Sequence, residues 1–154
     1  MGQFRQSDFV STDTLSVDSY GSGAAAFYVM SGEIGCQGNI IITVDEILDV
    51  VTAGEMPEVC TSRYSYNVRV FGQNTAFRYD NFHRHDDHPD EHHKHIFDFS
   101  TGTQLRTEWI GKDGWPTLSE VIEEARSWWS KNHSILVRPD EYPLHSELAQ
   151  VTEL

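Results

Sequence analysis

Six of the chain's eight histidines lie between residues 83 and 95. Carboxylates are interspersed with them, at Asp86, Asp87, Asp90 and Glu91. Histidine and aspartate bury poorly without a partner, so core packing does not explain such a cluster. These residue types serve as metal ligands, as general acids and bases, or as groups whose charge changes near neutral pH. The alternative is a polar surface loop without chemistry; a purification tag does not fit, because the run is internal and acids interrupt it.

The end of this cluster has the alternating pattern of a β-strand. Over residues 92–99, His93 and His95 share one face, and His92 and Lys94 share the other. The first pair therefore points the same way. His92 and Lys94 reach that side of the sheet only where a twist or bulge re-aims them.

Two further alternating runs precede the cluster, over residues 58–71 and 75–80, and a Gly-Gln-Asn loop at 72–74 joins them. This is the pattern of a β-hairpin. Pairing the apolar faces of its strands places Arg78 and Asp80 beside polar side chains of the first strand. Taken alone, these two charges are a surface ion pair worth at most about 1 kcal/mol.

One chemical interpretation is a metal site. His93 and His95 on one strand face, with imidazoles from the preceding loop, form the ligand set that zinc, nickel or copper prefers. The loop imidazoles are those of His83, His85 and His88. The spacing matches no standard zinc pattern, and we expect a divalent transition metal, zinc or nickel, if a metal is bound.

The other interpretation is metal-free cleavage of RNA. That reaction needs a base for the 2′-hydroxyl proton, an acid for the leaving oxygen and a cation for the phosphorane. Histidines with Lys or Arg supply all three near neutral pH. Asp80 can orient an imidazole, as carboxylates do in hydrolytic triads. The candidate catalytic residues are Arg78, Asp80, His92, His93, Lys94 and His95.

The same stretch resembles the signature of the TumE-like proteins. The resemblance is carried by Phe77-Arg78-Tyr79-Asp80-Asn81, by His85 and by His92-His93-Lys94-His95. It covers residues 25–131 in outline and is specific from residue 63 to residue 95. One departure is Asp90-Glu91, where the family usually has Phe-Pro. The resemblance implies the toxin component of a toxin–antitoxin pair, and hence an antitoxin protein as partner.

Composition narrows the class of protein. A chain of 154 residues with 38% hydrophobic residues is predicted to fold as one domain. It has no apolar run near the roughly 18 residues of a membrane span and no secretory signal, so we expect a cytoplasmic location and no membrane partner. Two cysteines do not make a disulfide framework. The oligomeric state is not determined by the sequence.

The net charge of −13 argues against nonspecific binding of nucleic acid, which needs Lys and Arg against phosphates. The charge is uneven, however. Between residues 63 and 94, five basic residues balance five acidic ones, whereas the rest of the chain is strongly negative. A less repulsive patch on an acidic body is compatible with steered binding of an anion, or with a basic partner.

The pattern predicts three parts: a flexible arm over 1–23 with one short strand at most, a domain over 24–132, and a polar tail over 133–154 that could end in a short helix. Residues 43–54 are ambiguous. Thr43 to Glu46 has the form of a helix capping box, but the β-branched content favours a strand. The family resemblance also implies a long strand here, and we predict one.

The clearest helix runs from Thr117 to Lys131, with Thr117 and Glu120 as a capping box and an apolar stripe that ends in a Trp pair. The predicted fold class is therefore α+β: an antiparallel meander of four to six strands with this C-terminal amphipathic helix packed on one face.

Three functions remain open from the sequence. The first is a toxin that acts on RNA as an endoribonuclease. The second is a His-rich metal-binding protein. The third is a non-catalytic module that binds an antitoxin or another partner through its polar sheet face. The toxin interpretation is preferred because the family resemblance and the acid–base residues coincide.

Overall fold

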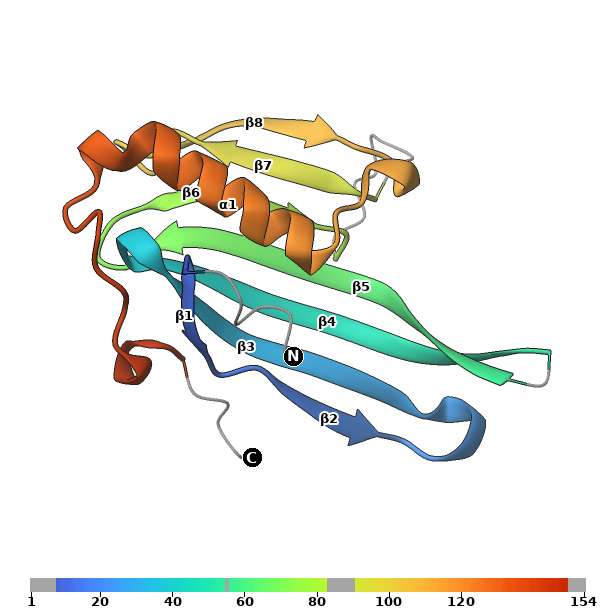
Figure 1. The fold of residues 1–154 in the computed structure, drawn as a ribbon. Helices are drawn as coiled ribbons and strands as arrows, with labels where there is room; N and C mark the ends of the chain where they lie inside the picture. The colour runs from blue at the N-terminus through green and yellow to red at the C-terminus, as the bar shows by residue number, and fades with distance from the viewer. Residues whose placement is uncertain (1–7, 55, 83–90, 150–154) are drawn as a thin grey trace.

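The structure, a computed structural model, describes residues 8–54, 56–82 and 91–149 (Figure 1). These residues form one open antiparallel sheet of eight strands with one α-helix on it. The strands are β1 (Val10–Asp13), β2 (Ser16–Tyr20), β3 (Phe27–Cys36), β4 (Ile40–Ala53), β5 (Met56–Val70), β6 (Thr75–Asp80), β7 (His93–Phe97) and β8 (Gln104–Trp109); the helix is α1 (Leu118–Asn132). Short 3-10 turns occur at Gly23–Ala25, Gln37–Asn39, Lys112–Gly114, His133–Ile135 and His145–Glu147.

The strand order is β1-β3-β4-β5-β6-β7-β8, so from β3 onward each strand lies beside the next one in the sequence. β1 and β2 both pair with β3, β1 near its end and β2 near its start. The α+β class with a helix on one face is confirmed, and so is the strand over residues 43–53. The predicted count of four to six strands is wrong.

The additional strands come mainly from the segment expected to be an arm. Residues 10–20 are polar and have no sustained apolar period, which is why their sequence does not reveal two strands. They are held by backbone hydrogen bonds to β3, which any sequence can make. The predicted tail carries no α-helix in its described part; the 3-10 turn His145–Glu147 stands there, and Val151 lies outside the described residues.

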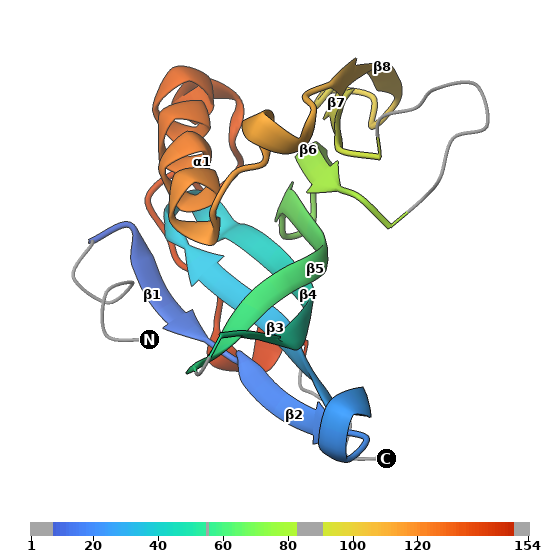
Figure 2. The ribbon, with the colours of Figure 1, turned by 90° about the vertical axis from the view of Figure 1, so that its right-hand side faces the viewer.

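The hydrophobic core lies between the sheet and α1. Alternation along β4 and β5 turns one set of side chains toward the helix, and these are fully or almost fully buried: Ile40, Ile42, Val44, Tyr64, Tyr66, Val68 and Val70. The helix buries Leu118, Val121, Ile122 and Ala125 against them. Its start is held by the predicted capping box, in which Thr117 Oγ1 accepts from the Glu120 backbone N–H. Seen from one end, the sheet is strongly twisted and α1 covers only one of its faces (Figure 2).

The turn between β3 and β4 is packed against the helix at Gly38. This residue has a φ of +80°, in the region where glycine is favoured. A Cβ atom at this position would lie 2.6 Å from the Trp129 ring. The close approach of the turn to the Trp129 indole therefore requires glycine here.

The face of the sheet that is turned away from α1 is polar. Strand pairing aligns two rows of side chains across it. One row is Glu33, Thr43, Asn67, Arg78 and His95. The other is Asp45, Ser65, Asp80 and His93.

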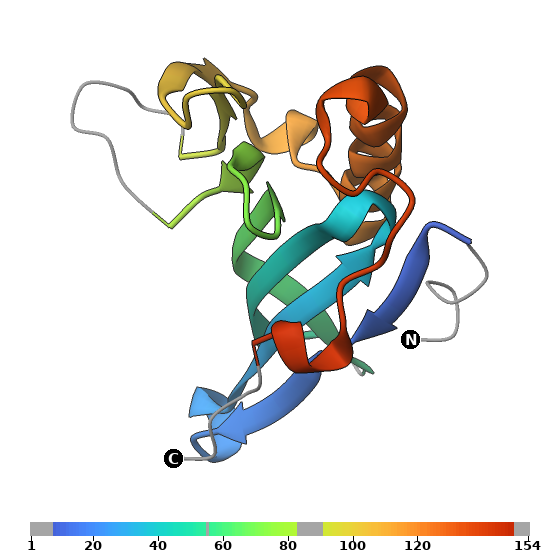
Figure 3. The same cartoon turned by 90° about the vertical axis from the view of Figure 1, so that its left-hand side faces the viewer.

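The chain after α1 returns to this polar face (Figure 3). We call residues 139–149 the C-terminal segment. Its Glu141 carbonyl accepts from the Asn39 backbone N–H, and its Ala149 N–H donates to Glu33 Oε1 at 2.6 Å. Leu148 is buried. The segment therefore covers the part of the polar face over β3 and β4. The part over β5, β6 and β7 lies beyond these contacts.

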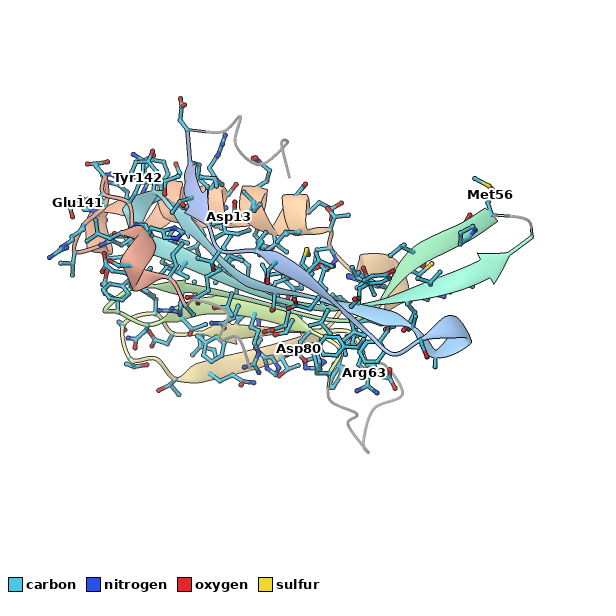
Figure 4. All side chains as sticks on the ribbon, turned by 90° about the horizontal axis from the view of Figure 1, so that it is seen from below. Asp13, Met56, Arg63, Asp80, Glu141 and Tyr142 are labelled. Carbon is cyan, nitrogen blue, oxygen red and sulfur yellow. The ribbon has the colours of Figure 1, made fainter. Side chains whose placement is uncertain are left out.

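Beyond the sheet, the ends of β4 and β5 extend as a two-stranded hairpin with Met56 near its tip (Figures 1 and 4). The hairpin exposes Val50, Val51, Met56 and Val59. No helix in the described part of the chain is long and apolar enough to cross a membrane.

Candidate functional site

Adjacent strands bring the two predicted runs together on the polar face. In the β6–β7 pairing, Arg78 lies opposite His95, and Asp80 lies opposite His93. All four side chains point away from α1, because the aromatic residues between them on β6 point toward the core. The alternation in the sequence predicted this common face, and the register places the two pairs side by side. We call these four residues the polar-face cluster.

Asp80 is the centre of the polar-face cluster. Its Oδ1 lies 3.0 Å from His93 Nε2, and its Oδ2 lies 3.0 Å from Arg78 Nε and 3.5 Å from His95 Nε2. The carboxylate is buried, with 2% of the residue exposed. Burying a carboxylate is costly unless charged or donor groups surround it, and three such groups do so here.

His93 is fully buried, at 0% exposure. Its Nδ1 lies 2.8 Å from the Glu91 carbonyl oxygen, which can only accept, so Nδ1 carries a hydrogen and donates it. Its Nε2 faces Asp80, and the Trp109 ring lies 5.4 Å away, centroid to centroid. A side chain enclosed in this way is closed off from a substrate in the open cavity and holds its neighbours in place.

His95 is also buried, but not completely, with 7% of the residue exposed. Its Nδ1 lies 3.3 Å from Thr107 Oγ1 on β8, and its ring meets that of His93 edge to face at 4.6 Å. Arg78 is the most accessible member, with about a third of its side chain exposed. Exposure within the cluster thus increases from His93 and Asp80 to His95, all three of which are buried, and then to Arg78 at the surface.

An open cavity of about 410 Å³ adjoins the cluster. Its lining is partly apolar and partly acidic: Val29, Asp45, Glu46, Ile47, Ser65, Arg78, Asp80 and Phe82. The cavity reaches from β3 to β6 across the polar face. A ligand in it would contact Arg78 directly.

Lys94 lies away from the cluster, on the helix side of the sheet. Its ammonium contacts the Glu124 carboxylate of α1 and lies about 5 Å from the ring centroids of Phe77 and Tyr79. The Tyr79 hydroxyl donates to the same carboxylate at 2.7 Å. Burial and then the Glu124 charge raise the pKa of the Tyr79 hydroxyl. Lys94 therefore joins sheet to helix.

His92 also lies on the helix side. Its Nδ1 is 3.1 Å from the Tyr64 hydroxyl, and its ring stacks near those of Tyr64 and Trp115. Of the predicted catalytic residues, the structure brings together Arg78, Asp80, His93 and His95, and separates His92 and Lys94 from them. The predicted metal ligands His83, His85 and His88 lie outside the described residues.

Three atoms of the cluster could hold a metal ion. The ligand atoms of Asp80, His93 and His95 all lie within 4.8 Å of one another. The other ring nitrogen of each histidine faces an oxygen, from Glu91 or Thr107, as is common for metal-bound imidazoles. This set is two histidines and a carboxylate, which zinc accepts in catalytic sites. The Arg78 guanidinium on the same carboxylate competes with a bound cation.

Two residues of this face were not among the predicted site residues. Arg63 lies on β5 in the alternation of Ser65, exposed, and it points to the same side of the sheet as Asp80 (Figure 4). Asp45 lies beside Ser65 on β4 and lines the cavity. The alternation of β5 could have indicated Arg63. Asp45 could not be assigned while residues 43–54 were ambiguous.

The fold and the cluster together define a small α+β protein whose sheet presents a buried His–Asp–His group and an arginine on its helix-free face. The chain belongs to the toxin TumE family: the family model, described as toxin TumE, matches residues 5–128. The match confirms the resemblance in the sequence and extends it to β1 and β2. Comparison with curated proteins and with solved structures found no match.

Proposed function

We propose that this chain is a toxin that cleaves RNA at the polar-face cluster, and that an antitoxin protein is its partner. The observation that carries the proposal is the convergence of His93, His95 and Arg78 on the Asp80 carboxylate, at 3.0 to 3.5 Å. Membership of a toxin family supports the biological role. The cluster supports the chemistry, because it joins an anchored imidazole to a phosphate-binding guanidinium.

Each member has a distinct role in this proposal. The Arg78 guanidinium bonds Asp80 through Nε, which leaves its outer nitrogens to bind the scissile phosphate and stabilise the phosphorane. His95 takes the proton of the 2′-hydroxyl as the 2′-oxygen attacks phosphorus. The bond from phosphorus to the 5′-oxygen then breaks, and water in the open cavity protonates the departing oxygen. Asp80 and His93 hold Arg78 and His95 in position.

The net negative charge of the chain is compatible with RNA binding when only a few phosphates contact the protein. Arg63, Arg69 and Arg78 all lie on the polar face, and Arg78 lines the cavity. Few phosphate contacts mean that few counterions are released on binding. We therefore expect RNA binding with a shallow dependence on salt, unlike that of basic nucleic-acid-binding proteins.

The test uses expression of wild type, Arg78→Ala and His95→Ala in a host without the partner, followed by growth curves and RNA integrity. Arg106→Ala and His133→Ala are matched controls, because both side chains are exposed and lie outside the cluster. We expect wild type and the controls to slow growth and degrade RNA, and the two cluster variants to do neither. Slow growth with intact RNA would retain the toxin and discard the mechanism. Wild type with neither effect would end the nuclease proposal.

A second candidate function is metal-assisted cleavage, favoured by the three ligand atoms within 4.8 Å. A bound divalent ion would activate water near the phosphate. Elemental analysis of protein purified without a tag or chelator tests it. About one equivalent of zinc or nickel, lost in His95→Ala and retained in His145→Ala, would support this candidate. No transition metal above background would remove it.

A further inference from the structure

The cavity beside the polar-face cluster has a second end, away from Arg78. Asp45 on β4 lies opposite Ser65 on β5, and Ser65 lies opposite Asp80 on β6. Two strand spacings of about 4.8 Å put the Asp45 and Asp80 backbones roughly 10 Å apart. All three side chains line the cavity. A ligand held at Arg78 by a phosphate would therefore reach Asp45 with its next chemical group.

The apolar walls of the cavity are suited to a flat aromatic ring. Val29 and Ile47 line the cavity on the β3–β4 side and are half-buried, so each presents part of its apolar surface to the opening; Phe82, also half-buried, lines the cavity on the β6 side. Val29 pairs with Ile47 across β3 and β4, which makes one continuous apolar patch. Unstacked bases of single-stranded RNA bind to such surfaces and stack on aromatic side chains.

The polar group at this end is Asp45, which is exposed at the opening of the cavity. Within the described residues, no hydrogen bond or ion pair to the Asp45 carboxylate is present, although its neighbours on both flanking strands are polar. Partial desolvation in the cavity and the nearby Glu33 charge raise the pKa of Asp45 from its ordinary value of 3.8. The ligand that suits this carboxylate brings N–H donors, because an ionised carboxylate only accepts hydrogen bonds.

We propose that this end of the cavity is a subsite for a guanine base, with Asp45 as the specificity-determining residue. The inference rests on the proposed cleavage of RNA and names the nucleotide that the site selects. Guanine presents two adjacent donors on its Watson–Crick edge, N1–H and the N2 amino group, which match the two oxygens of a carboxylate. Adenine and cytosine place a ring-nitrogen acceptor beside their amino group, and that acceptor would face the carboxylate unfavourably. Uracil offers one N–H between two carbonyl groups.

The binding test does not require cleavage. Full-length His95→Ala protein is titrated with guanosine, adenosine, cytidine and uridine 3′-monophosphates by calorimetry. We expect the guanosine nucleotide to bind at least roughly tenfold more tightly than the others, the range for a bidentate contact to a base edge. Adding Asp45→Asn should remove this preference. Asp49→Asn is the matched control, four residues further along the same face of β4 and outside the cavity lining.

The cleavage test maps the ends of RNA fragments produced by wild type, Asp45→Asn and Asp49→Asn. We expect wild type and Asp49→Asn to cut next to guanosine, and Asp45→Asn to cut with reduced base preference. Both substitutions are isosteric, and thermal unfolding verifies that each variant folds.

The outcomes separate the two proposals. Cleavage without base preference, or a guanine preference that survives in Asp45→Asn, would overturn the subsite and leave the nuclease in place. Guanine-selective binding that depends on Asp45 in a protein that does not cleave RNA would support the subsite and overturn the nuclease. Equal and weak binding of all four nucleotides would overturn the subsite.

Discussion

Asp80 and His93 lie directly opposite each other on β6 and β7, and their Oδ1 and Nε2 atoms are 3.0 Å apart in the interior of the protein. The other ring nitrogen of His93 donates to the Glu91 carbonyl. The pair is thus fixed at both ends before any ligand arrives. His95 and Arg78, which share the second oxygen of the carboxylate, are positioned by this pair. Preorganisation of this kind is what an acid–base site needs.

The His95 ring is the predicted proton-transfer group. We expect His95→Ala to lower the rate of RNA cleavage by about 10²–10⁴-fold, the usual loss for a general acid or base. The side chain of His95 is 8% exposed and that of His93 is 0% exposed, so the space left by His95→Ala is the more accessible of the two and added imidazole should restore part of the activity. The measurement is the initial cleavage rate of a short RNA with and without imidazole. Full activity of the variant would place the proton transfer elsewhere, and His133→Ala should behave as wild type in both assays.

Substitution of Asp80 or His93 should have a different effect from substitution of His95. We expect Asp80→Ala to destabilise the protein by about 3–5 kcal/mol, because it leaves buried donors without their carboxylate. His93→Ala should likewise lower stability and activity together, and imidazole should not rescue it, since the ring is enclosed. Urea unfolding measures the first effect. Glu58→Ala, at an exposed position on β5, should stay within about 0.5 kcal/mol of wild type. A wild-type midpoint for Asp80→Ala would contradict the central role of this carboxylate.

The helix-side position of Lys94 leads to a third prediction. We expect Lys94→Met to retain RNA cleavage within a few-fold of wild type, because its ammonium contacts Glu124 and not the cluster. Methionine keeps the unbranched stem that packs over Phe77. Stability should fall modestly, since a partly exposed ion pair contributes about 1 kcal/mol or less. Loss of cleavage in a variant with a near-native unfolding midpoint would return Lys94 to the active site.

Much of the site could be predicted because period-2 alternation is a local property. It assigns Arg78, Asp80, His93 and His95 to faces without knowledge of the fold. Register is not local: the pairing of Asp80 with His93 depends on how the β6–β7 connection closes, and no spacing rule specifies that. Burial is not local either. The sequence treats His93 and His95 as equivalent, whereas the structure buries His93 completely and leaves His95 with 7% exposure.

The fold was harder to predict at the N-terminal end. β1 and β2 have no apolar period, because β2 is exposed at four of its five residues and β1 buries only Val10. Their pairing with β3 relies on backbone hydrogen bonds. The residues between 133 and 149 are polar with scattered apolar positions, so the sequence did not show that Leu148 is buried on the sheet.

The last prediction concerns Glu33, which holds the C-terminal segment on the sheet. Burial alone would raise the pKa of this carboxyl, but hydrogen bonds from Thr43, the Ala149 backbone N–H and Arg69 outweigh burial and lower it. A carboxyl whose pKa is lower in the folded state stabilises the fold above its unfolded pKa of 4.5, and this stabilisation is lost as the pH falls through the folded value. We therefore expect the Ala149 amide to be protected from hydrogen exchange at neutral pH and to lose protection below about pH 4.5.

Glu33→Gln should show weaker protection at neutral pH and little further change on acidification, because glutamine does not titrate. The measurement is native-state hydrogen exchange of the Ala149 amide between pH 7 and pH 3, corrected for the intrinsic exchange rate. Asp140→Asn is the control, since its exposed carboxylate pairs with His133 outside this network. Protection that is unchanged in Glu33→Gln at pH 7 would show that the segment is held in place by its other contacts, such as Leu148 packing and the Thr14 hydrogen bond to the Ala149 carbonyl.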